Sequence, residues 1–151
     1  MWCMTSKTYT ASDDPLTYAI IGCAMRVHRE LGPGLLESAY EECLSRSMSK
    51  SGLSIERQPR VKISYEGTIL HREYRPDFVV QDEVVVEVKS VGGFLPVHQA
   101  QLLTYMKLAE IERGLLINFN VALLKDGIKR MIMTKAPNGA SVSSVSSVSS
   151  E

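Results

Sequence analysis

The segment from residue 75 to 90 places charged side chains inside two strongly apolar runs. It reads RPDFVVQDEVVVEVKS, and its polar middle predicts a turn between two strands. Asp77, Glu87 and Lys89 interrupt the valine runs, although burying a charge is costly unless the charge is paired or binds a metal. Because side chains alternate along a strand, Glu87 and Lys89 share one face. A turn at 81–83 would bring Asp77 close to Glu87, and we expect one patch of two carboxylates and one ammonium.

Composition limits what kind of protein this is. The 151 residues suit one domain, and 44% hydrophobic with 23% charged residues is typical of soluble globular domains. The formal net charge of zero argues against a basic nucleic-acid coat and leaves room only for a local basic patch. Three cysteines form no CxxC pair, and neither a signal peptide nor a membrane span is indicated. We therefore expect a cytoplasmic protein without a membrane segment.

Apolar spacing predicts three helices. The first covers residues 14–31 and begins at an Asp-Pro pair, the second covers 35–52 after a Gly-Pro-Gly break, and the third covers 96–110. Cys23 lies in the apolar stripe of the first helix, where a small buried hydrophobe is favoured over a reactive thiol.

Alternating and apolar runs predict the strands. An antiparallel meander is expected from residues 54–67, 68–74, 76–80 and 83–90, with a turn at Glu-Gly. The apolar run 113–119 follows a helix and is expected to be a parallel strand buried on both faces. Residues 123–133 indicate a turn and an edge strand.

The predicted organisation is one folded domain with irregular ends. We expect a flexible N-terminal arm at 1–12, the domain at 13–135 and a disordered serine-rich tail at 136–151. The fold class is α/β, with a mixed central β-sheet flanked by helices on both sides.

Two carboxylates at fixed spacing, without a histidine cluster or thiolate pair, make a hard oxygen site. Such sites suit Mg²⁺ or Mn²⁺ better than zinc or copper. A metal of this kind recruits phosphate and lowers the pKa of a bound water, and Lys89 could orient that water or neutralise phosphate charge. The patch therefore predicts metal-dependent phosphodiester hydrolysis. A structural ion-pair cluster in an unrelated α/β domain stays open as an alternative.

Asp77, Glu87 and Lys89 stand in the order D-x9-E-x-K, and Pro76 directly precedes the aspartate. This pattern resembles the PD-(D/E)XK nuclease superfamily. The resemblance implies a restriction-endonuclease-like arrangement of the α/β fold and a nuclease activity.

Two further motifs resemble branches of that superfamily. Gln101 and Tyr105 resemble the QxxxY motif of the RecB-like branch, and GLLESAY at 34–40 resembles the name-giving motif of the small bacterial GxxExxY proteins. The similarity covers roughly residues 14–133.

The resemblance also implies roles for individual residues. Asp77 and Glu87 would bind the metal, the Val88 carbonyl would be a third ligand and Lys89 would be the catalytic cation. Glu37 would reach the metal directly or through water, although from the residues alone an ordinary solvated helix glutamate is an equally good interpretation.

Other roles follow from the same resemblance. Gln101 and Tyr105 would steady the active site or the scissile phosphate. His28 lies where related nucleases can carry an active-site histidine, although a packed helix residue is at least as good an interpretation. Apart from the resemblance, six basic residues could make a local phosphate-binding surface that the neutral total charge hides, although for each residue taken alone an ordinary solvated charge is the favoured interpretation: Arg72, Arg75, Lys107, Lys125, Lys129 and Arg130.

The function expected from these observations is a Mg²⁺- or Mn²⁺-dependent nuclease acting on DNA through a metal-activated water. A catalytically inactive nuclease-fold module that binds nucleic acid or a protein partner is the alternative. A homodimer or a protein partner remains open, because no separate recognition domain is visible in the sequence.

Overall fold

The computed structural model describes residues 2–4 and 10–135, apart from the side chains of residues 71–73. The elements in chain order are β1 (Trp2–Met4), α1 (Pro15–Leu31), α2 (Glu37–Lys50), β2 (Ile55–Arg57), β3 (Val61–Tyr65), β4 (Thr68–Tyr74), β5 (Phe78–Val80), β6 (Val84–Lys89), α3 (Pro96–Ala109), β7 (Arg113–Asn118), the 3-10 helix η1 (Leu124–Gly127) and β8 (Ile128–Lys135). The three helices and the strands around the charged segment were predicted. The tail predicted at 136–151 lies outside the described residues.

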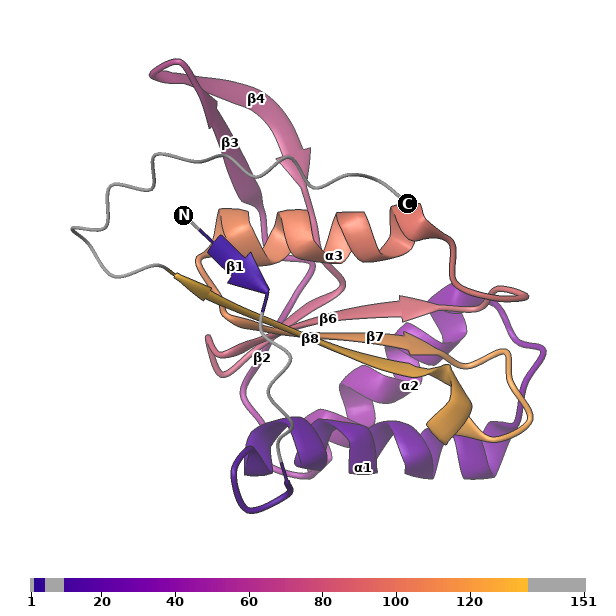
Figure 1. The fold of residues 1–151 in the computed structure, drawn as a ribbon. Helices are drawn as coiled ribbons and strands as arrows, with labels where there is room; N and C mark the ends of the chain where they lie inside the picture. The colour runs from indigo at the N-terminus through magenta and orange to yellow at the C-terminus, as the bar shows by residue number, and fades with distance from the viewer. Residues whose placement is uncertain (1, 5–9, 136–151) are drawn as a thin grey trace.

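The central sheet has the strand order β1-β8-β7-β6-β5-β2. Strands β6 and β7 are parallel, and the other neighbouring strands are antiparallel. Helices α1 and α2 lie against one face of this sheet and α3 lies against the other (Figure 1). This confirms the α/β fold class, with helices on both sides of a mixed sheet, and the parallel β7.

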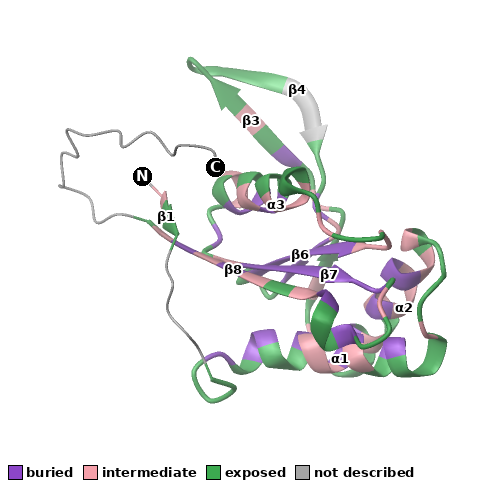
Figure 2. Cartoon of the chain, turned by 45° about the vertical axis from the view of Figure 1, so that its right-hand side comes forward, coloured by how far each residue is buried: buried purple, intermediate pink, exposed green. Residues whose placement is uncertain are grey.

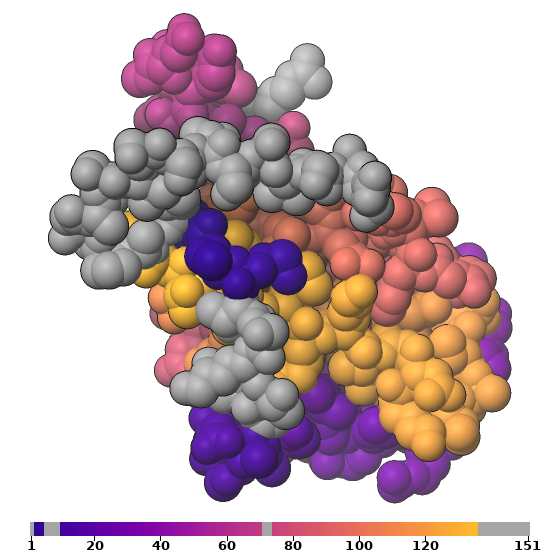
Figure 3. All heavy atoms as spheres, viewed as in Figure 1, coloured from indigo at the N-terminus to yellow at the C-terminus, as the bar shows by residue number. Residues whose placement is uncertain are grey.

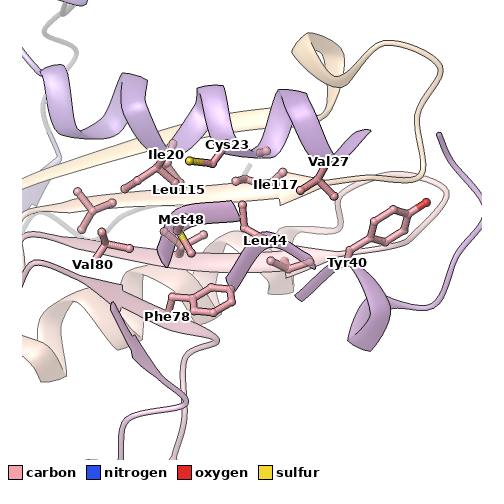
Figure 4. Packing of buried hydrophobic residues seen from close by; sticks show 14 of the residues in the cluster. Ile20, Cys23, Val27, Tyr40, Leu44, Met48, Phe78, Val80, Leu115 and Ile117 are labelled. Carbon is pink, nitrogen blue, oxygen red and sulfur yellow. The ribbon is translucent and has the colours of Figure 1, made fainter. Parts of the chain in front are cut away.

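Alternation along β6 divides its side chains between two hydrophobic clusters. Val84, Val86 and Val88 pack with α1 and α2, whereas Val85 packs with α3. Figure 4 shows the first cluster, in which α1 and α2 side chains, including the fully buried Cys23, lie over the strands. Because alternation continues to the strand end, Glu87 lies on the α3 face of a strand that is buried on both sides.

The predicted meander is wrong in its pairing. Strands β3 and β4 form a separate two-stranded sheet, and β2 pairs directly with β5. Gln58 follows β2 with a φ of 49°, and Pro59 comes next, so the chain leaves the sheet there. The Glu-Gly turn is confirmed, because Glu66 and Gly67 both have positive φ, as a two-residue hairpin turn requires.

The predicted edge strand is also wrong in its position. β8 is covered by β1, with Cys3 opposite Thr134. β1 consists of residues 2–4 of the expected N-terminal arm, and three residues are too few to give a periodic signal. No helix among the described residues is long and apolar enough to span a membrane.

Gly114 determines how closely α3 approaches the sheet. A Cβ at this position would lie 2.5 Å from the Met106 sulfur and 3.1 Å from a Leu102 methyl group. We expect Gly114→Ala to lower the free energy of unfolding by about 1–3 kcal/mol, because added volume in a packed core displaces its neighbours. Chemical denaturation measures this effect. Gly92→Ala is the control, because nothing lies within 4 Å of a Cβ there; equal stability of the two variants would contradict this packing.

Candidate active site

Asp77 and Glu87 lie side by side where β5 begins and β6 ends. The backbone N–H of Asp77 donates to Glu87 Oε1 at 2.9 Å, and the backbone N–H of Val88 donates to Asp77 Oδ2 at 2.7 Å. These bonds continue the β5–β6 pairing, in which Phe78 is opposite Val86. The predicted turn therefore does bring the two carboxylates together.

The Val88 peptide faces the same gap. Lys89 O accepts a hydrogen bond from the N–H of Phe119 on the β7 side, whereas Val88 N–H points to Asp77 on the β5 side. In a strand, the N–H and C=O of one residue point toward the same neighbouring strand. The Val88 carbonyl therefore also points toward the β5 side, at a position that lies just before the first residue of β5. Two carboxylates and one backbone carbonyl therefore face this edge.

Burial dominates the electrostatics of the two carboxyl groups. Glu87 is only 3% exposed, and its burial together with the nearby Asp77 carboxylate raises its pKa to about 8. Burial likewise raises the pKa of Asp77 to about 6, against the lowering effect of the Val88 hydrogen bond. Without a cation, these carboxylates are unfavourably placed in their charged form.

Lys89 supplies one positive charge beside the pair. Its Nζ lies 3.4 Å from Glu87 Oε2, and its side chain is 12% exposed. Burial lowers the pKa of Lys89, but the nearby carboxylates, with Glu87 foremost, raise it further, and the net pKa is above its usual value. Lys89 is therefore a cation at neutral pH.

Glu37 approaches the same lysine from the other layer. It is the first residue of α2, its side chain is 44% exposed, and its Oε1 lies 3.8 Å from Lys89 Nζ. The loop before α2 is tied to the end of β6, because Ser90 Oγ donates to Leu35 O at 2.7 Å. Glu37 thus contacts Lys89, and no direct contact with Asp77 or Glu87 is among the hydrogen bonds of the described residues.

Tyr40 holds that loop in place. Its hydroxyl donates to Gly32 O at 2.5 Å and accepts from the Leu35 N–H at 3.1 Å, while its ring stacks on Phe119 with centroids 4.6 Å apart. The tyrosine of the GLLESAY segment is fully buried, so its contacts are structural. It positions the backbone that leads into Glu37.

Gln101 and Tyr105 lie on α3, above the face that carries Glu87. Gln101 Nε2 donates to Tyr105 Oη at 2.9 Å. Burial, followed by the charge of Glu87, raises the pKa of Tyr105. Tyr105 therefore keeps its phenolic proton.

Glu41 and Gln58 belong to the surroundings of Asp77, although neither residue was predicted to take part in the site. Glu41 is 7% exposed and accepts hydrogen bonds from Arg57 Nε and Gln58 Nε2, both at 3.1 Å. The backbone N–H of Gln58 in turn donates to Asp77 O at 2.9 Å. The available signal was that Glu41 lies one helical turn after Glu37. The two residues brace the backbone of Asp77.

Other predicted residues lie elsewhere. His28 is buried, with its Nε2 2.8 Å from the Val121 carbonyl, which supports the packed-helix interpretation. Arg130 donates to the buried Asp14 at 2.7 Å, so it is engaged in a structural ion pair. Arg75 and Lys107 are exposed, and the side chain of Arg72 is outside the described part of the chain.

The donors suit a hard cation. Among residues 2–4 and 10–135, no group of three or more His, Cys, Asp and Glu side chains is arranged to hold a metal ion. Mg²⁺ needs fewer protein ligands than such a group provides, because waters and substrate oxygens complete its coordination beside one or two carboxylates. Asp77 and Glu87, both poorly solvated as anions, fit such an ion, and a zinc site of histidine and cysteine is not formed by these side chains.

A family model matches most of the chain. The model of the PD-(D/E)XK nuclease superfamily matches residues 14–131, which is more than half of the chain and includes every residue of the candidate site. No curated protein and no solved structure gives a significant match.

Proposed function

Because the chain belongs to the PD-(D/E)XK nuclease superfamily, we propose that it is a Mg²⁺- or Mn²⁺-dependent nuclease that hydrolyses phosphodiester bonds of DNA. The observation that carries this proposal is the half-buried Asp77 beside the buried Glu87, with the Lys89 ammonium 3.4 Å from Glu87. Two adjacent carboxylates with little access to water repel each other when both are charged, and a bound divalent cation would relieve that repulsion.

The metal would be held by Asp77, Glu87 and the Val88 carbonyl. When bound, it supplies a water of lowered pKa and neutralises phosphate charge. Lys89, which keeps its proton, donates a hydrogen bond to the attacking water or to a phosphate oxygen in the transition state. Glu37 holds the Lys89 ammonium from the solvent side and can accept a hydrogen bond from a water at the site.

Tyr105 and Gln101 would act on the phosphate from α3. The phenolic O–H of Tyr105 stays protonated and can donate to a phosphate oxygen, while Gln101 fixes the orientation of that hydroxyl. This is the role we propose for the QxxxY pattern of the RecB-like branch. We likewise propose that the chain is a GxxExxY protein, in which Tyr40 supports the loop that presents Glu37.

The surface for DNA would be local. Two arginines, Arg72 and Arg75, shortly precede Asp77 in the chain, and Lys107 lies on α3. These residues could neutralise phosphates near the cleavage site, although the whole chain has no net charge. Sequence specificity would then come from DNA structure, from a homodimer or from a protein partner.

Metal binding should depend steeply on pH. The pKa of Asp77 is raised to about 6 and that of Glu87 to about 8, so both carboxyl groups hold protons in the metal-free protein below pH 6. Since only the carboxylates bind metal, Mg²⁺ affinity is expected to rise from pH 6 to pH 8.5, with protons released on binding. Calorimetry in buffers of different ionisation enthalpy measures both. An affinity that does not change over this range would contradict the assigned ligands.

A cleavage assay tests the function itself. Supercoiled plasmid and a labelled single-stranded oligonucleotide are incubated with purified protein in Mg²⁺, in Mn²⁺ and in chelator. We expect cleavage only with a metal, and only by protein that retains Lys89. DNA binding without cleavage under all these conditions would favour the inactive nuclease-fold module instead.

A further inference from the structure

The polar side chain of Asn118 lies at the end of an otherwise apolar strand. Residues 114–119 read GLLINF, and Asn118, the last residue of β7, is 2% exposed. β7 and its neighbour β6 are buried along most of their length (Figure 2). Because a buried amide is costly unless its polar atoms are paired, the asparagine needs specific partners here.

The amide of Asn118 pairs with one residue of the segment that follows β6. Its Oδ1 accepts from the backbone N–H of Val91 at 3.1 Å, and its Nδ2 donates to Val91 O at 2.9 Å. The side chain thus makes both of the hydrogen bonds that an antiparallel strand neighbour would make. The same Oδ1 also accepts from the Asn120 N–H at 3.1 Å, and the segments after β6 and β7 lie side by side at the surface (Figure 3).

Val91 lies two residues beyond Lys89, so these bonds hold the chain directly after the candidate catalytic lysine. The backbone pairing with β7 reaches Lys89, whose carbonyl accepts from the Phe119 N–H at 2.9 Å. After Val91 come Gly92 and Gly93, where a Cβ would meet nothing within 4 Å. The Asn118 side chain therefore fixes the end of β6 just before a pair of glycines.

Asn118 and Lys89 are also neighbours across the sheet. In the parallel register of β6 and β7, Lys89 is opposite Asn118. Alternation puts Glu87 and Lys89 on the α3 face of β6, and it puts Asn118 on the α3 face of β7, because Leu116 packs in the α3 cluster. The Lys89 side chain, which is 12% exposed, therefore has Asn118 on its β7 side.

We propose that Asn118 is a positioning residue for Lys89. Its amide holds the backbone at Val91 and flanks the lysine, which keeps the ammonium 3.4 Å from Glu87 Oε2. A leucine at this position would fill a similar volume without pairing the Val91 N–H. This inference rests on the proposed function and adds a residue that acts through Lys89 rather than on the phosphate. Misplacing a catalytic group by about 1 Å can cost on the order of a hundredfold in rate.

A double-mutant cycle with Lys89 tests this role. Single-turnover cleavage of a labelled oligonucleotide, with protein in excess and Mg²⁺ saturating, is measured for wild type, Asn118→Ala, Lys89→Ala and the double variant. Asn118→Ala is expected to slow cleavage by about tenfold or more when Lys89 is present, and by less than about twofold when it is absent, because residues that act as one unit are not additive. Calorimetry should give an unchanged Mg²⁺ affinity, since Asn118 is not a ligand. A merely structural role would slow both backgrounds alike.

Two further variants separate Asn118 from its loop. Asn120→Ala is the matched control, because Asn120 is exposed and its Nδ2 is 3.4 Å from Val91 O; its cleavage rate should stay within about twofold of the wild type. Asn118→Asp has the shape of asparagine and keeps an acceptor for the Val91 N–H, but it cannot donate to Val91 O. It should cleave more slowly than Asn120→Ala.

Amide hydrogen exchange of Val91, followed by NMR in metal-free protein, tests the contact without any reaction. The Val91 N–H is expected to be protected in the wild type and in Asn120→Ala, and to exchange at least about tenfold faster in Asn118→Ala. The amide of Val86, in the middle of β6, should keep its exchange rate in all three proteins.

Three results would overturn the positioning role while wild-type cleavage leaves the nuclease intact. These are equal rate losses from Asn118→Ala with and without Lys89, Asn118→Ala and Asn118→Asp rates equal to that of Asn120→Ala, and an unchanged exchange rate of Val91. A wild-type protein that cleaves no DNA with either metal would instead refute the proposed function, and this role with it.

Discussion

Lys89→Ala is expected to slow metal-dependent DNA cleavage by at least about 10²-fold, on the order of 2.7 kcal/mol or more of transition-state stabilisation. The Lys89 ammonium is 3.4 Å from Glu87 Oε2 and its side chain is only 12% exposed, so it lies beside the carboxylate pair. Metal binding should persist with equal or higher affinity, because the ligands remain and a repelling charge is removed. Single-turnover cleavage of a labelled oligonucleotide measures the rate, and calorimetry measures the affinity.

The matched control is Lys50→Ala. Lys50 is an exposed lysine at the far end of α2 from Glu37, and its removal should leave cleavage unchanged. If Lys89→Ala cleaves as fast as Lys50→Ala, then Lys89 is not catalytic and any observed activity arises at another site or from a contaminant.

Asp77→Ala should remove both metal binding and cleavage. At a Mg²⁺ concentration one hundred times the dissociation constant, the metal adds about 2.7 kcal/mol to the stability of the wild type, and this gain should vanish in the variant. Burial raises the pKa of Asp77 from 3.8 to about 6. The metal-free fold therefore loses stability as the pH rises between these two values, and the whole loss is present at higher pH. Thermal unfolding at pH 8, with and without Mg²⁺, is the measurement.

Asp126→Ala provides the comparison for this variant. Asp126 is exposed in η1 and is not among the assigned metal ligands, so its variant should keep the full Mg²⁺-dependent rise in Tm. A rise in Asp77→Ala as large as in Asp126→Ala would show that the metal binds elsewhere.

Much of the central architecture could be predicted because it depends on local signals. The Asp-Pro start of α1, the Gly-Pro-Gly break before α2 and the valine alternation of β6 each act within a few residues. The proximity of Asp77 and Glu87 followed from a single turn between two apolar runs. The two residues are close along the chain, so few alternative pairings of their strands could compete.

The remaining features depend on contacts between distant segments. β1 is three residues long and exists through its pairing with β8, more than one hundred residues later. The alternating pattern of β3 and β4 predicted the two strands correctly, but not their pairing. The backbone of Gln58 has a positive φ, and after it the chain leaves the central sheet and forms the separate β3–β4 sheet. Gln58 joins α2 to the loop after β2, because its side chain donates to Glu41 and its backbone N–H donates to Asp77 O. The helical spacing of Glu37 and Glu41 placed Glu41 near the site but could not indicate these contacts with Gln58.

Asp77 and Glu87 are expected to form a divalent-metal site, and a calorimetric titration with Mg²⁺ and Mn²⁺ is the decisive experiment. Wild-type protein, Asp77→Ala and Glu87→Gln are titrated at pH 8, where both carboxyl groups can lose their protons to the metal. We expect saturable binding by the wild type that is lost in both variants. Absence of binding by the wild type, or binding that survives both substitutions, would contradict it.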